Sequence, residues 1–144
     1  MKMKMKNLKN IAVMLLMFVF ATSCILEEVE PEYDVVGAVG TISTLTASNT
    51  SPEVGQTVTF TMTIYSEHEN ATELRMNRGT GSAATTVETK TFTSWNTEDS
   101  YVETFQYTIP EDAAGNTLTM EFVLVTESNF TARRSINLNV AAGE

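Results

Sequence analysis

Residues 57–65 read TVTFTMTIY, and this stretch decides the fold. Val58, Phe60, Met62 and Ile64 alternate with threonines and a final tyrosine. A period of two residues places successive side chains on opposite faces of a β-strand. Threonine suits such a strand because its branched Cβ packs well on a pleated surface. We therefore expect a half-buried strand over residues 57–65, with its four apolar side chains in a core.

The same periodicity continues on both sides of this strand. Turn residues separate the apolar runs, for example Pro52 and Gly55 before the strand and the sequence GTGS at 79–82. The run TLTMEFVLVT at 117–126 is the most apolar and should lie centrally in a sheet. The run at 85–93 offers only Val87 and Phe92 to the core and should form an edge. In all, the pattern predicts strands at 41–47, 57–65, 72–77, 85–93, 101–109, 117–126 and 133–140.

Seven short strands without a convincing helix indicate an all-β protein built as a single β-sandwich. The stretches PEVGQTVTF (52–60) and FQYTIPEDAAGNTLTMEF (105–122) resemble immunoglobulin-like modules of bacterial surface proteins. This resemblance implies an immunoglobulin-like β-sandwich over residues 40–142. The chain has no cysteine pair, and no tryptophan stands on the third predicted strand. These departures exclude the antibody subtype and favour a cadherin- or fibronectin III-like variant.

The first 23 residues have the anatomy of a signal peptide. Four lysines precede an uncharged apolar run at 11–21, which is too short to span a hydrocarbon core of ~30 Å. The following stretch, FATSC at 20–24, resembles a lipobox, the signal for bacterial lipoprotein maturation, with Ala21 where leucine or valine is commonest. The resemblance implies cleavage before Cys24 and its lipidation, so that the protein is held in a membrane by several acyl chains. Cys24 is the only cysteine of the chain, so no disulfide is expected.

After this cleavage, five basic residues remain against 18 acidic ones, which gives a formal net charge of −13. Such a charge disfavours nucleic acid and anionic lipid surfaces as partners. Residues 24–39 are rich in glutamate and aspartate and contain Pro31, which predicts an extended acidic linker. Acidic residues soon after a lipidated cysteine resemble the export signal of Bacteroidota surface lipoproteins. That resemblance implies an outer-membrane lipoprotein that faces the cell exterior.

No residue set in the sequence has the pattern of a catalytic site. A Ser/His/Asp triad would have to use His68, the only histidine, and no G-x-S-x-G elbow is present. Glu67 and Glu69 flank His68, but neighbours in sequence rarely converge on one zinc ion. Calcium ligands could come from the oxygen-rich runs 96–99 and 111–112, yet neither has an EF-hand spacing. We therefore expect a non-enzymatic protein without metal or cofactor.

One group of side chains follows from the parity of the strands. The loops after the second, fourth and sixth predicted strands emerge at the same end of an up-and-down arrangement. They carry the candidate ligand-binding residues His68, Trp95, Asn96, Asp99, Asn129 and Phe130. Aromatic rings beside amides and carboxylates are what sugar-binding and protein-docking surfaces use. The alternative is that Trp95 and Phe130 fold back and cap the core. The linker enters at this same end, which favours a membrane-embedded neighbour over a large soluble ligand.

These observations predict a lipid-anchored surface protein whose immunoglobulin-like domain is a non-catalytic binding or accessory module. Its partners would be the membrane, through Cys24, and an outer-membrane protein or glycan in a nutrient-uptake or surface complex. The alternative is a structural or adhesive subunit in which an edge strand, the fourth above all, pairs with another chain.

Overall fold

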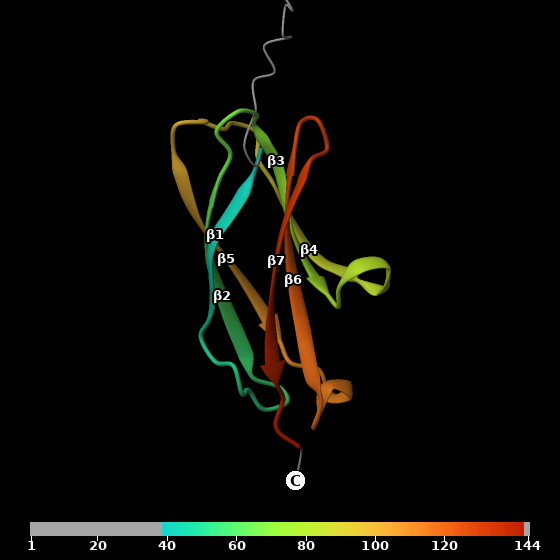
Figure 1. Ribbon diagram of the computed structural model, residues 1–144. Helices are drawn as coiled ribbons and strands as arrows, with labels where there is room; N and C mark the ends of the chain where they lie inside the picture. Colours follow the sequence, from blue (N-terminus) through green and yellow to red (C-terminus); the bar gives the residue numbers. More distant parts are fainter. Residues whose placement is uncertain (1–38, 143–144) are drawn as a thin grey trace, which may run out of the picture. The chain divides into compact units, whose positions relative to one another are not determined.

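The computed structural model describes residues 39–142, and the predicted signal peptide, Cys24 and the linker up to residue 38 lie outside these described residues (Figure 1). The described chain is all-β, as predicted. Its strands are β1 (Thr41–Ala47), β2 (Thr57–Tyr65), β3 (Ala71–Arg78), β4 (Thr85–Thr91), β5 (Ser100–Thr108), β6 (Thr117–Thr126) and β7 (Thr131–Asn139). Two single turns of 3-10 helix, η1 (Gly81–Ala83) and η2 (Glu111–Ala113), lie in loops. In residues 39–142 no helix has the length and apolar character to cross a membrane.

The strands form two antiparallel sheets, one with the order β1-β2-β5 and the other with the order β4-β3-β6-β7. The predicted edge position of β4 and the interior position of β6 are both confirmed. β1 contacts β7 across the sandwich. Counting inward from this pair, β2 lies over β6 and β5 over β3, so the extra strand β4 has no strand opposite it (Figure 1).

The core lies between the sheets and centres on three phenylalanines. The ring of Phe122 lies 5.2 Å from that of Phe60 and 5.7 Å from that of Phe105, both of which belong to the other sheet. The four apolar residues predicted to face inward from β2 are fully buried. β6 is buried on both faces, which the sequence did not predict, because Val123 and Val125 on its outer face are only 2% and 4% exposed.

A basic side chain closes each open side of the sandwich. On one side Arg134 of β7 donates to the carbonyl oxygens of Ile42, at 3.0 Å, and of Ser43. These carbonyls flank the register shift of β1, so the guanidinium satisfies a β-bulge. On the other side Lys90 of β4 pairs with Glu103 of β5 at 2.8 Å and lies 5.0 Å from the ring centre of Phe105. Arg134 is therefore a bridge between the sheets.

The predicted burial of Val87 in the core is wrong. Its side chain is 42% exposed, although it belongs to β4. The register explains this, because Met76 of β3 pairs with Glu88 and the next residue, Asn77, pairs with Thr86. Val87 is thus the extra residue of a β-bulge, without a partner on β3 and with no strand of the other sheet above it.

Candidate binding surfaces

The three loops predicted to share an end do so in the structure. We call this the entry end, and its loops are residues 66–70, 92–99 and 127–130. The indole nitrogen of Trp95 donates to the carbonyl oxygen of Ser66 at 3.3 Å, which joins the second loop to the first. The side-chain amide of Asn70 donates to the Glu127 carboxylate at 3.0 Å, which joins the third loop to the first. The loop 66–70 is therefore the centre of the entry end.

Trp95 is packed against the end of the core. Its ring meets Phe92 edge-on at 5.1 Å and lies 4.4 Å from the ring of Tyr101. The residue is half-buried and also makes the hydrogen bond to Ser66. This arrangement agrees with the alternative that Trp95 caps the core, because its indole is held by three neighbours.

The other candidate residues of the entry end divide into two kinds. Asn96 and Asp99 hold their own loop: the Asn96 side-chain amide donates to Asp99 at 2.7 Å, and its carbonyl accepts from the Glu98 N–H at 3.1 Å. Asn129 has a positive φ of 62° and shapes the tip of the β6–β7 hairpin. Only His68 and Phe130 are exposed without such a role, Phe130 with 57% of its surface accessible.

The chain enters the sandwich at this end. The hydroxyl oxygen of Ser66 lies 2.5 Å from the carbonyl oxygen of Val39 and 2.6 Å from that of Glu69, and its single proton serves one of them at a time. Ser66 is fully buried. Residue 39 is therefore pinned to the loop 66–70, and everything before it in the chain is attached at the entry end.

A small acidic hollow lies between two of these loops. It measures about 240 Å³ and is lined by residues that include Tyr65, Glu67, Glu98 and Asp99. Within residues 39–142, no three histidine, aspartate or glutamate side chains are placed so that they could share a metal ion.

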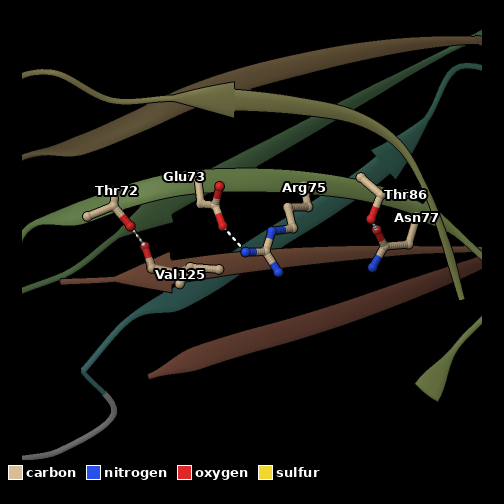
Figure 2. A network of polar contacts seen from close by, with 6 residues as sticks. All are labelled: Thr72, Glu73, Arg75, Asn77, Thr86 and Val125. Atoms are coloured by element: carbon tan, nitrogen blue, oxygen red, sulfur yellow. Dashed lines mark hydrogen bonds and ion pairs between the residues drawn. The ribbon is translucent and has the colours of Figure 1, made fainter. Parts of the chain in front are cut away.

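Polar side chains cover the outer face of the four-stranded sheet, as Figure 2 shows. Glu73 pairs with Arg75, and Thr86 donates to Asn77 at 2.9 Å. Arg133 pairs with the buried carboxylate of Glu121 at 3.1 Å. In the register, Arg75 and Arg133 flank Val123 on either side. Long arginine stems cover apolar surface while their guanidiniums reach water, which explains why Val123 is buried. The polar groups of this face bind one another.

A second, larger hollow lies at the opposite end of the sandwich, which we call the far end. It is a groove of about 690 Å³ between the end of β3, the start of β4 and the start of β6. Its apolar lining includes Val87 and Leu118, and Tyr107 of β5 lies along its side. The groove exists because β4 has no strand opposite it, so its inner face stays open beyond β5. We call this hollow the distal groove.

An ion pair stands at the rim of the distal groove. The guanidinium of Arg78 lines the groove and makes two hydrogen bonds to the carboxylate of Asp112, at 2.6 Å and 3.3 Å. This contact raises the pKa of Arg78 and lowers the pKa of Asp112 from their ordinary values. Tyr107 adds to the rise in the pKa of Arg78 and lines the same groove. The rim therefore presents a charged but neutralised pair beside an aromatic ring.

Gly79 shapes one wall of the groove. It has a φ of +85°, and a Cβ at this position would lie 3.3 Å from the carbonyl oxygen of Ala83. Its N–H donates to Thr119 of β6 at 2.8 Å, which ties the β3–β4 loop to the sheet. A residue with a side chain would strain this turn, because L-residues rarely adopt a positive φ.

Sequence reasoning missed the distal groove, although part of its signal was present. The loops after the first, third and fifth strands share an end by the same parity that joined the entry-end loops. The sequence GTGS at 79–82 predicts only a turn, and PEDAAGN at 110–116 predicts only a loop. The groove itself depends on which of the two sheets β4 joins, and the alternation of apolar and polar residues does not predict that.

Comparison with known proteins adds support for the fold only. No family model and no curated protein matches the sequence. Among solved structures, Spo0M, a sporulation control protein from Bacillus subtilis, is similar over 75% of this chain, with 12% identity and a TM-score of 0.52. A DUF4466 family protein from Parabacteroides merdae ATCC 43184 is similar over 69%, with 14% identity and a TM-score of 0.47. The chain spans 51% and 43% of the lengths of these two proteins. At such identities the likeness to Spo0M indicates a related β fold and does not assign an activity.

Proposed function

We propose that the protein is a lipoprotein, anchored through Cys24 in the outer membrane and exposed on the cell surface, whose β-sandwich is a non-catalytic binding module. The observation that carries the proposal is the position of residue 39. The chain joins the sandwich at the entry end, and the distal groove lies at the other end. Residues 24–38, fifteen in all, precede Val39 and can span at most ~50 Å when fully extended. An anchor on Cys24 would then hold the entry end and leave the groove free to meet a ligand.

The finer assignment of the fold belongs to this proposal. In constant-type immunoglobulin domains the fourth strand belongs to the same sheet as the first, second and fifth. Here β4 pairs with β3 in the other sheet. We propose the fibronectin III-like variant, which is consistent with the missing cysteine pair and the absence of a tryptophan on β3.

Features of the four edge strands, β1, β4, β5 and β7, disfavour assembly by strand addition. β1 has a bulge at Ser43, and β4 has one at Val87. β4 and β5 carry the inward charges Lys90 and Glu103, and β7 carries Arg134. Bulges and inward-pointing charges are the devices by which natural sheets prevent edge-to-edge pairing. This favours a binding module over the alternative of an adhesive subunit joined through β4.

The proposal is tested in the native host. Radiolabelled palmitate should enter the protein, and a Cys24→Ser variant should lose the label. Because residue 24 lies outside the sandwich, the variant should keep its fold, which circular dichroism of the released protein checks. Protease added to intact cells should remove the wild-type protein from the surface. Palmitate labelling that persists in Cys24→Ser, or full protection from external protease, would contradict the anchoring or the display respectively.

A further inference from the structure

We propose that the distal groove binds an uncharged oligosaccharide. The inference deepens the proposed function, because it gives the binding module a place and a ligand class. It rests on the size of the groove, the chemistry of its lining and its balance of charge. It also rests on the Lys90–Glu103 ion pair, which closes the groove toward the middle of β5.

The groove has the size of a ligand site. Its volume of about 690 Å³ lies within the range of roughly 300–1,000 Å³ that is usual for small-ligand pockets. Its lining combines an apolar floor, which includes Val87 and Leu118, with the ring of Tyr107 and the hydroxyl-bearing residue Thr85. Sugar rings present apolar faces of C–H groups and edges of hydroxyls. An aromatic ring beside hydrogen-bonding neighbours is suited to both.

The Arg78–Asp112 pair supplies a donor and an acceptor at fixed positions. Arg78 is about one-third exposed and Asp112 about two-thirds exposed, with side-chain exposures of 34% and 64%. A guanidinium has five N–H donors and a carboxylate has about four acceptor sites, so the two bonds between them leave both groups with free capacity. Neighbouring hydroxyls of one sugar can accept from Arg78 and donate to Asp112 together.

The charge of the groove selects against ionic ligands. Arg78 is its one charged lining residue, and Asp112 neutralises it. Each of the five basic residues in 39–142 is already held, four of them in ion pairs and Arg134 by backbone carbonyls. An anionic ligand would therefore meet a strongly acidic chain with no spare cation, and a cationic one would find no carboxylate among the residues that line the groove. An uncharged ligand avoids both penalties.

The Lys90–Glu103 ion pair limits how far a ligand in the groove could extend along β5. The Lys90–Glu103 ion pair crosses the gap between β4 and β5 at 2.8 Å. Below it, β5 continues only from Thr104 to Thr108, which is about 17 Å at 3.4 Å per residue. A strand that paired along β5 beyond this length would have to displace Lys90, whereas a ligand of two or three sugar rings would not.

The test uses the full chain purified in detergent and four hexasaccharides: cellohexaose, maltohexaose, mannohexaose and the anionic hexamer of galacturonic acid. Isothermal titration should show at least one neutral hexamer binding with a dissociation constant of roughly 10 μM to 1 mM, and weaker or no binding of the anionic one. Trp95, the single tryptophan, lies at the entry end, so its fluorescence should stay unchanged during the titration. A change in Trp95 emission on binding would place the ligand at the other end and overturn the inference.

Variants locate the binding more closely. Asp112→Asn should weaken it about tenfold, and Tyr107→Ala about tenfold or more. Glu111→Gln, which removes the neighbouring exposed carboxylate outside the ion pair, should leave it unchanged. Since Tyr107→Ala could disturb β5, circular dichroism checks its fold, and the surface variant Asp112→Asn keeps the test decisive if that fold is lost. Equal affinity in wild type and Asp112→Asn, no binding of any neutral hexamer at 10 mM, or displacement of the sugar by a synthetic peptide of residues 131–139 would each refute the proposal. Palmitate labelling is scored separately, so the anchor and the ligand can fail independently.

Discussion

Replacing Arg134 by methionine should destabilise the sandwich far more than the same change at Arg75. Methionine keeps much of the stem of Arg134 and removes the donors to the carbonyl oxygens of Ile42 and Ser43. Ser43 is exposed, so water can satisfy its carbonyl after the change. Ile42 is 7% exposed, and its carbonyl at the bulge would lose its partner.

The expected loss in the free energy of unfolding follows from this difference in exposure between the two carbonyls. A hydrogen bond from a charged donor contributes about 1.5–3 kcal/mol, and the bond to Ile42 should account for nearly all of the loss. We therefore expect the free energy of unfolding to fall by about 2 kcal/mol. At roughly 4–8 °C per kcal/mol for a domain of this size, the melting temperature should drop by about 10 °C.

Arg75→Met is the matched control. Arg75 pairs with Glu73 on the open face of the sheet, where the two side chains are 42% and 23% exposed. Exposed pairs contribute about 0–1 kcal/mol, so this variant should stay near wild type. Guanidinium unfolding of both variants, followed by Trp95 fluorescence and circular dichroism, gives the comparison. If the two variants unfold within 0.5 kcal/mol of each other, or if Arg134→Lys is no better than Arg134→Met, the proposed bridge between the sheets is wrong.

Three further predictions concern the groove and the entry end. Gly79→Ala should lower the free energy of unfolding by more than the ~1–2 kcal/mol strain of a left-handed residue, because the new Cβ would contact Ala83. Gly81→Ala has open space around its Cβ and should show this strain alone. Thermal melts of the two variants test the difference. Asp112 has a lowered pKa because of its bond to Arg78, so its contribution to stability is complete above its ordinary pKa of 3.8 and is lost as the pH falls through the lower folded value. The melting temperature of Asp112→Asn should therefore fall less between pH 5 and pH 2 than that of wild type. Parallel pH profiles of the two melting temperatures would contradict a stabilising Arg78–Asp112 pair. Phe92→Ala should shift the emission of Trp95 to longer wavelength by removing the ring that packs edge-on against it, and an unmoved spectrum would show that Trp95 does not depend on this contact.

The sequence carried most of the local structure. The bounds of β1, β2 and β6 agree with the alternation of their side chains, and the other strands differ by one or two residues. Strand parity also placed the loops of Ser66, Trp95 and Asn129 at one end. Alternation and parity are properties of the chain itself, because a strand reverses its facing at every residue and an antiparallel chain reverses its end at every turn.

Tertiary structure decided what depends on the pairing of distant segments. Val123 of β6 is buried because β3 and β7 each bring an arginine beside it. Val87 stays exposed because it is the extra residue of β4 against β3 and no strand lies opposite it. Arg134 bridges the sheets because β1 happens to be the strand across from β7. The distal groove has the same origin: β4 joined β3 and left one sheet a strand wider than the other. The residues of the chain fixed which segments became strands and which side of each strand was apolar. The choice of neighbours, made by packing among residues far apart in sequence, created the open inner face beside Tyr107 and Arg78.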